Sequence, residues 1–290
     1  MRRFSQFACI DWSGAQGLRQ AGIAVAICTA GNAAPRLMER DGGWSRGGVL
    51  DWLIEQADIQ SDLLIGIDFS LSLPFDPDHG FFPGWGTAPR TARELWGFVD
   101  DVCRDDPHFA ANSFVDHTEA SRYFRRSHGR RGDRFAGTTG AYRRVEQRCR
   151  DGGYGPAQSC FNLVGAAQVG KSSLTGMRIL NRLDCAIPLW PFDEVADTGP
   201  AIVEIYTTVA ARAAKVRGGS KIRNAPELDR ALWQLDTHPH QPLARYDDHS
   251  TDAVLTAAWL RHVAAEPSLW SPPDMTDQIR CTEGWTFGIL

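Results

Sequence analysis

The chain lacks a long apolar run. No segment approaches the roughly 18 consecutive apolar residues that a membrane-spanning helix needs, and the apolar stretch near the start is interrupted by Asp11. From these two features we expect no transmembrane helix and no secretory signal peptide. We therefore expect no membrane partner.

The chain also has few cysteines, and they do not form a recognisable pattern. There are seven, an odd number, without CxxC or Cys/His spacing. This excludes a disulfide framework and a structural zinc site as the basis of the fold. A reducing compartment fits such a protein, so we expect a cytoplasmic location.

Positive charge is in short supply overall, with 31 Lys and Arg against 35 Asp and Glu. The formal net charge of −4 excludes a globally basic nucleic-acid binder, so any such interface must be local. Residues 118–151 are the one basic stretch, with ten Arg against four acids. It either contacts phosphates or is a solvated, ion-paired surface. The phosphate-contact interpretation assigns that role to Arg125, Arg126, Arg130 and Arg131.

With 43% apolar residues, the 290-residue chain has enough material for a substantial core. Its opening third reads as β-β-β-α-β, from apolar runs and helical spacing. Residues 74–100, rich in Pro, Gly and aromatics, are predicted to be a long loop or insertion. The expected strands are 7–12, 21–28, 35–39, 62–68, 158–164, 201–206 and a short closing strand at the tail. The expected helices are 47–58, 171–183, 226–235 and 250–264.

Three aspartates have a similar placement. Asp11 and Asp68 each end an apolar strand, and Asp252 lies in the predicted first turn of a late helix behind Ser250 as N-cap. In an α/β sheet, ligands gather at the carboxyl ends of the strands, so these side chains are expected to converge. A carboxylate set without His/Cys clusters matches Mg²⁺ or Mn²⁺, and a pair of such ions is suited to phosphodiester hydrolysis.

Two further groups are secondary candidates. Glu204 lies within an apolar strand, where a carboxylate is costly unless it binds a metal or pairs with an arginine such as Arg212 or Arg223. Asp248 and His249 precede Asp252, and they are either solvated loop residues or accessory members of the metal site.

Several segments together resemble the RNase H-like superfamily, in the order of its Holliday-junction-resolvase branch. They are IDWSG, LLIGIDFSLSLP, AIVEIYTT and DDHSTDAVLTAAWLR, and they are most similar to a family of predicted RNase H-like nucleases. The resemblance implies a mixed five-stranded sheet flanked by helices, in one domain over 1–290. Its core would be 5–75 and 200–290, with an α-rich insertion over 76–199. It also implies Asp11, Asp68 and Asp252 as metal ligands, with Glu204 as a possible fourth catalytic acid.

A competing motif lies in the insertion. Residues 165–172 read GAAQVGKS and match the phosphate-loop pattern, in which Lys171 would contact phosphates and Ser172 would bind Mg²⁺. The match leaves a nucleotide-binding ATPase or kinase as an alternative. In a third interpretation, Lys171 and Ser172 contact a substrate phosphate beside the acids. A non-catalytic RNase H-like binding protein is also open, as is the oligomeric state.

Overall fold

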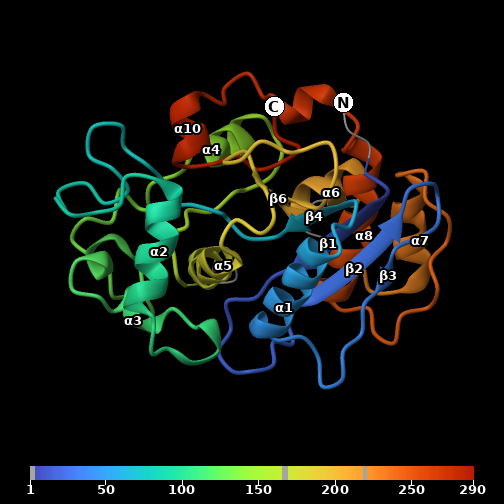
Figure 1. The fold of residues 1–290 in the computed structure, drawn as a ribbon, viewed down its shortest axis with the longest axis horizontal. Helices are drawn as coiled ribbons and strands as arrows, with labels where there is room; N and C mark the ends of the chain where they lie inside the picture. The colour runs from blue at the N-terminus through green and yellow to red at the C-terminus, as the bar shows by residue number, and fades with distance from the viewer. Residues whose placement is uncertain (1–3, 165–168, 218–220) are drawn as a thin grey trace.

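A mixed sheet organises the molecule (Figure 1), and the computed structural model describes residues 4–164, 169–217 and 221–290. The sheet has six strands among these residues, in the order β3-β2-β1-β4-β6-β5. β1 pairs antiparallel with β2, and β2 with β3, whereas β4, β6 and β5 continue from β1 in parallel. The strands are β1 (Gln6–Asp11), β2 (Ala24–Thr29), β3 (Arg36–Leu37), β4 (Leu63–Ile67), β5 (Leu189–Trp190) and β6 (Ala201–Glu204).

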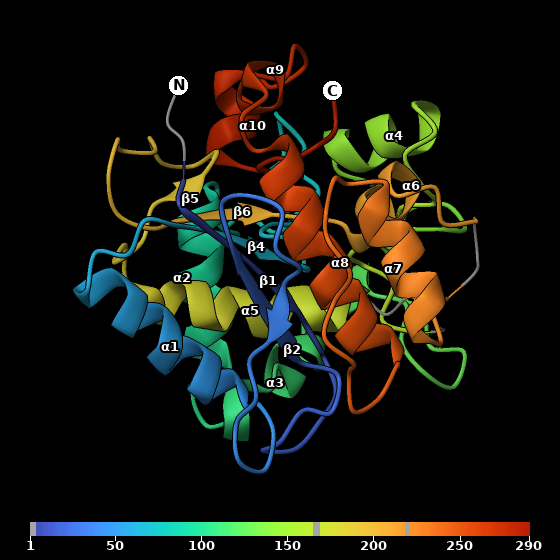
Figure 2. The ribbon, with the colours of Figure 1, turned by 90° about the vertical axis from the view of Figure 1, so that its right-hand side faces the viewer.

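Helices cover both faces of this sheet (Figures 1 and 2). On one side, α5 (Val169–Leu183) packs between α1 (Arg46–Asp58) and α2 (Ala92–Val102). On the other side, α8 (Asp248–Val263) lies against β1 and β2 and is flanked by α6 (Thr207–Ala213) and α7 (Ala225–Trp233). The short elements are η1 (Pro107–Phe109), α3 (Asn112–Val115), η2 (Ala120–Tyr123), α4 (Arg144–Asp151), α9 (Pro267–Trp270) and α10 (Asp277–Cys281).

The two faces bury separate apolar clusters because side chains alternate along each strand. Ile10, Ile65 and Ile67 point toward α1 and α5, whereas Cys9, Leu64 and Val203 point toward α8. β1 and β4 are central and covered on both sides, which explains why they read as continuous apolar runs.

The predicted β-β-β-α-β opening and the helices near 171–183, 226–235 and 250–264 are confirmed. Three expectations are wrong. The sheet has six strands instead of five, because the two-residue β5 joins its edge. Residues 158–164 form no strand, only an isolated bridge between Asn162 and Arg125. The tail likewise contributes a single bridge, from Thr286 to Glu204.

The predicted insertion, 76–199, supplies part of the central architecture. It contains α2, which forms within the stretch predicted as loop and begins with a capping box between Thr91 and Glu94. It also contains α5, whose Leu174 and Met177 belong to the same buried cluster as Ile65 of β4. The insertion therefore contributes to the covering of one sheet face.

Within the described ranges, no helix combines the length and apolar character needed to cross a membrane. All seven cysteines are free thiols, and five of them are buried.

Candidate functional site

Asp11 and Asp68 are neighbours across the pairing of β1 with β4. The parallel register places Ile10 opposite Ile67, and the Asp68 amide donates to the Ile10 carbonyl over 3.0 Å. The next residue on each strand is the aspartate, so the two carboxylates leave the sheet side by side. Because Ile10 and Ile67 face α5, the alternation directs both aspartates to the opposite face, where α8 lies.

Helix α8 brings Asp252 and His249 to this place. The two residues are three apart and so lie on one helix face. His249 Nδ1 is 2.6 Å from Asp11 Oδ2. The helix begins one residue after Asp247, whose side chain accepts from the Ser250 amide. The expected N-cap at Ser250 is therefore wrong, and Asp252 lies in the second turn.

The electrostatics show that the three aspartates, here called the acidic centre, share one environment. Burial raises the pKa of Asp68 well above its usual value, and the charge of Asp11, a hydrogen bond with Asp11 and the charge of Asp252 raise it further. Burial also raises the pKa of Asp11, although the hydrogen bond from His249 opposes this. The buried Cys9 thiol has its pKa raised by burial and then by the charges of all three aspartates. Negative charge is therefore concentrated here.

Two cations partly offset this charge. Lys221 Nζ is 3.0 Å from Asp252 Oδ2 and 3.7 Å from Asp248 Oδ2. The hydrogen bond to Asp11 raises the pKa of His249. Both side chains are nearly half exposed, at 47% and 44%. Sequence reasoning missed Lys221, which lies 31 residues before Asp252 in a segment without a recognisable motif.

The donor set suits a hard divalent ion, because it consists of carboxylate oxygens in negative excess. The described side chains are not gathered around a single metal position, since no group of three or more His, Cys, Asp or Glu among them is arranged to hold an ion. Instead, Lys221 and His249 occupy positions on Asp252 and Asp11 where a bound cation would compete with them. The residues fit the chemistry of Mg²⁺ or Mn²⁺, and binding would require these two contacts to rearrange.

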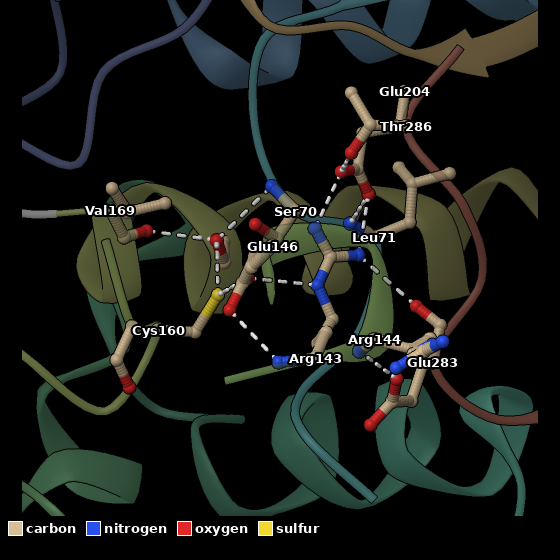
Figure 3. A network of polar contacts seen from close by, with 12 residues as sticks. Ser70, Leu71, Arg143, Arg144, Glu146, Cys160, Val169, Glu204, Glu283 and Thr286 are labelled. Atoms are coloured by element: carbon tan, nitrogen blue, oxygen red, sulfur yellow. Dashed lines mark hydrogen bonds and ion pairs between the residues drawn. The ribbon is translucent and has the colours of Figure 1, made fainter. Parts of the chain in front are cut away.

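Glu204 belongs to a different buried cluster (Figure 3). Arg143 places its guanidinium against both Glu204 oxygens, at 2.5 and 2.8 Å, and its Nε donates to Glu146 over 2.9 Å. The arginine that pairs with Glu204 is therefore Arg143, and the expectation of Arg212 or Arg223 as its partner is wrong. We call Arg143, Glu146 and Glu204 the Arg143 network.

The register explains why Glu204 leaves the sheet on a different face from Asp68. Glu204 is paired with Ile67, one residue before Asp68, so it leaves the sheet on the opposite face. Its Oε2 also accepts from the Leu71 amide over 2.8 Å, which holds the segment that follows Asp68.

The GKS segment lies close to the acidic centre. A Cβ on Gly14, three residues after Asp11, would be 2.5 Å from the Ser172 amide nitrogen. A cavity of about 220 Å³ is lined by Asp68 and Ser172, and also by Arg143, Glu146 and Glu204 of the Arg143 network. Trp12 and Tyr206 are among its other lining residues. Ser172 and Asp68 therefore face the same cavity.

The phosphate-loop interpretation finds less support. Residues 165–168 of the motif lie outside the described residues, whereas Lys171 and Ser172 lie in the first turn of α5. The strand that should precede such a loop is not formed, because residues 158–164 contain only the isolated bridge.

The arginines of the basic stretch lie apart from the acidic centre. Arg126 is paired with Asp116 over 2.7 Å, and the Arg131 guanidinium donates to the Phe135 and Gly137 carbonyls. Arg125, Arg130 and Arg131 are exposed, and within the described residues none of the four arginines contacts Asp11, Asp68 or Asp252. Elsewhere in the stretch, Glu146 pairs with Arg143.

A buried arginine that sequence reasoning missed holds the loop after β1. Arg46 of α1 is 1% exposed and donates to the Ser13 carbonyl over 2.9 Å and to the His108 carbonyl over 3.0 Å. Burial lowers the pKa of Arg46 to about 10.

No protein-family model matches the chain, and neither a curated protein nor a solved structure is significantly similar to it. The chemistry of the site therefore has to be argued from its own residues.

Proposed function

We propose that the acidic centre binds Mg²⁺ or Mn²⁺ and that the protein hydrolyses phosphodiester bonds of nucleic acid, as an RNase H-like nuclease. The observation that supports this most is the meeting of three carboxylates from β1, the end of β4 and α8. Asp11 is buried, Asp68 and Asp252 are partly buried, and Lys221 and His249 offset their charge in part. A stable fold gains nothing from such repulsion, so the arrangement is expected to serve an external cation.

Each residue has a role in this proposal. Asp11, Asp68 and Asp252 are the metal ligands, and the bound ions would supply Lewis acidity and a hydroxide nucleophile from water at neutral pH. His249 donates to Asp11 and orients its carboxylate, whereas Thr207 contacts Asp68 Oδ2 over 3.4 Å. Ser172 lines the cavity that Asp68 also lines, and Lys171 precedes it on α5, so we assign both residues to contact with the phosphate.

The test is cleavage of single- and double-stranded DNA and RNA in the presence of Mg²⁺ or Mn²⁺, with Asp11→Asn as the key variant. We expect cleavage by the wild-type protein and its loss in Asp11→Asn. Asp51→Asn is the matched control, because Asp51 is exposed on α1. Thermal unfolding with added Mn²⁺ gives a second measurement, since a ligand that binds the folded state raises the unfolding temperature.

Two results would count against the assignment. Normal cleavage by Asp11→Asn would show that the activity arises elsewhere. A rise in unfolding temperature with Mn²⁺ that depends on Asp11, without cleavage of any nucleic acid, would leave a metal-binding protein that is not a nuclease.

A further inference from the structure

Two adjoining hollows lie beyond Asp252, bounded by α6, α7 and α8, which Figure 2 shows next to one another. The first, about 220 Å³, is lined by Asp252 and Thr207 together with Arg212. The second, about 570 Å³, extends to Arg230 of α7. Both are lined by Val216, Arg217, Lys221 and Ile222, so they adjoin along a common wall, and the first of them begins at Asp252 of the acidic centre.

This depression, which we call the basic groove, is rich in cations. Its basic side chains are Arg212, Lys215, Arg217, Lys221 and Arg230, and its acids are Asp252 and Glu227. Lys215, Arg217 and Arg230 are exposed and form no ion pair within 4.0 Å with any residue in the described ranges, although the charge of Arg230 acts on Glu227. A local excess of unpaired positive charge therefore borders the most negative site of a chain whose net charge is −4.

The position of the basic groove beside the acidic centre would help a negatively charged substrate to bind there. Buried carboxylates repel a phosphodiester, so a polyanionic substrate needs cations close by to hold it at the site. Arginine is well suited to this because its planar guanidinium binds phosphate oxygens through two hydrogen bonds. Residues Arg125, Arg126, Arg130 and Arg131 meet this need less well, because no described contact links them to the acidic centre and Arg126 is already paired.

We infer that the basic groove binds the sugar-phosphate backbone of the nucleic-acid strand whose scissile phosphate lies at the acidic centre. The inference rests on the proposed function for its substrate, but it makes a separate claim about binding. Arg217 and Arg230 contact backbone phosphates, with Lys215 beside them, and the strand leaves the site between α6 and α7. Contacts of this kind position the substrate without reading its sequence.

The experiment measures binding without turnover. A fluorescent single-stranded DNA is titrated with the full chain in EDTA at several salt concentrations, and fluorescence anisotropy gives the association constant. For single strands, the slope of log K against log salt changes by about 0.7 for each phosphate contact. The double variant Arg217→Gln/Arg230→Gln should therefore bind more weakly and show a slope shallower by roughly 1.4, twice that value.

Two variants serve as controls. Arg104→Gln removes an exposed arginine that pairs with Asp101 away from the groove, and it should leave the slope unchanged. Arg130→Gln/Arg131→Gln removes two cations from the basic stretch and tests the competing path. An unchanged thermal unfolding temperature verifies that the double variants fold, as expected for exposed side chains.

An unchanged slope in the groove variant overturns the inference. If the Arg130/Arg131 variant then shows weaker binding and a shallower slope, the basic stretch is the segment that binds the nucleic-acid backbone. Equal weakening of binding to polyglutamate, which lacks phosphate, would also overturn it and assign the groove to acidic polymers in general. If the groove variant shows a shallower slope but the wild-type protein cleaves no nucleic acid, the groove still binds the backbone and the nuclease proposal fails. The two proposals are thereby separable.

Discussion

The acidic centre and the Arg143 network both bury carboxylates where parallel strands of one sheet end, yet they balance charge differently. In the network, Arg143 is 1% exposed and contacts both Glu146 and Glu204. Burial alone would lower the pKa of Arg143, but the charges of Glu204 and Glu146 outweigh it and raise this pKa. At the acidic centre, the partners are half-exposed Lys221 and His249, and three aspartates share them. Carboxylates outnumber cations in both regions, and burial raises the pKa of Glu146 as well. The regions differ in the counterion, because a buried arginine holds the network together whereas the half-exposed counterions of the acidic centre can give way to an external cation.

The largest expected effect is in the network. Arg143→Met leaves Glu204 and Glu146 buried without their counterion, so the free energy of unfolding should fall by about 3–5 kcal/mol. Urea denaturation followed by fluorescence measures this loss. Arg104→Met is the control, because its partner Asp101 is 74% exposed and such pairs contribute about 0–1 kcal/mol. A loss of the same size as in the control would mean that the network is not a scaffold.

The next largest loss of stability should come from the loop after β1, which packs against the start of α5. Gly14→Ala would place a Cβ 2.5 Å from the Ser172 nitrogen, so the loop or α5 must shift. Overpacking of this kind costs about 1–3 kcal/mol. Gly86→Ala is the matched control, because nothing lies within 4 Å of its added Cβ. We expect Gly14→Ala also to weaken Mn²⁺ binding, and an unchanged unfolding free energy would show that the contact is loose.

The meeting of Asp11 and Asp68 could be predicted from sequence, because each ends an apolar run and parallel strands end at one edge. The pairing of Glu204 with Arg143 could not, since it depends on a one-residue register between β4 and β6 that no local pattern encodes. The same limit applies to Lys221, which reaches Asp252 only through the packing of its segment against α8.

Elements of the fold were likewise predictable only where the local sequence carries a pattern. Long periodic segments such as α5 and α8 were predictable, whereas β5, with only two residues, carries too little pattern to recognise. Residues 158–164 were apolar enough for a strand, but their bridge partner is Arg125, which lies outside the sheet.

Replacing a carboxylate by its amide should change the free energy of unfolding in opposite directions in the two regions. Asp68 binds its proton more tightly when folded than when unfolded, because its pKa is raised on folding. Its contribution to stability is therefore lost as pH rises from about 4, the usual carboxyl value, through the raised pKa. Asp68→Asn should stabilise the protein at neutral pH by about 0.5–2 kcal/mol, a range typical of stabilising substitutions.

Chemical denaturation at a series of pH values measures this effect. The gain from Asp68→Asn should be near zero around the usual carboxyl pKa and should grow toward neutral pH. Glu204→Gln is the matched variant from the network, and it should destabilise, because Arg143 loses its bidentate partner. A loss of stability in both variants would contradict the distinction between site and scaffold.

The smallest effect concerns Lys221. Its ammonium offsets Asp252, but the side chain is 47% exposed, so Lys221→Met should cost at most about 1 kcal/mol in the metal-free protein. A bound divalent ion has to compete with Lys221 for Asp252, so the same variant should bind Mn²⁺ a few times more tightly, as measured by isothermal titration calorimetry. Lys215→Met, on the neighbouring groove wall without an aspartate contact, should leave Mn²⁺ affinity unchanged. Weaker Mn²⁺ binding in Lys221→Met would instead mean that the lysine organises the acidic centre, and the contrast with Arg143, which does organise its network, would then be lost.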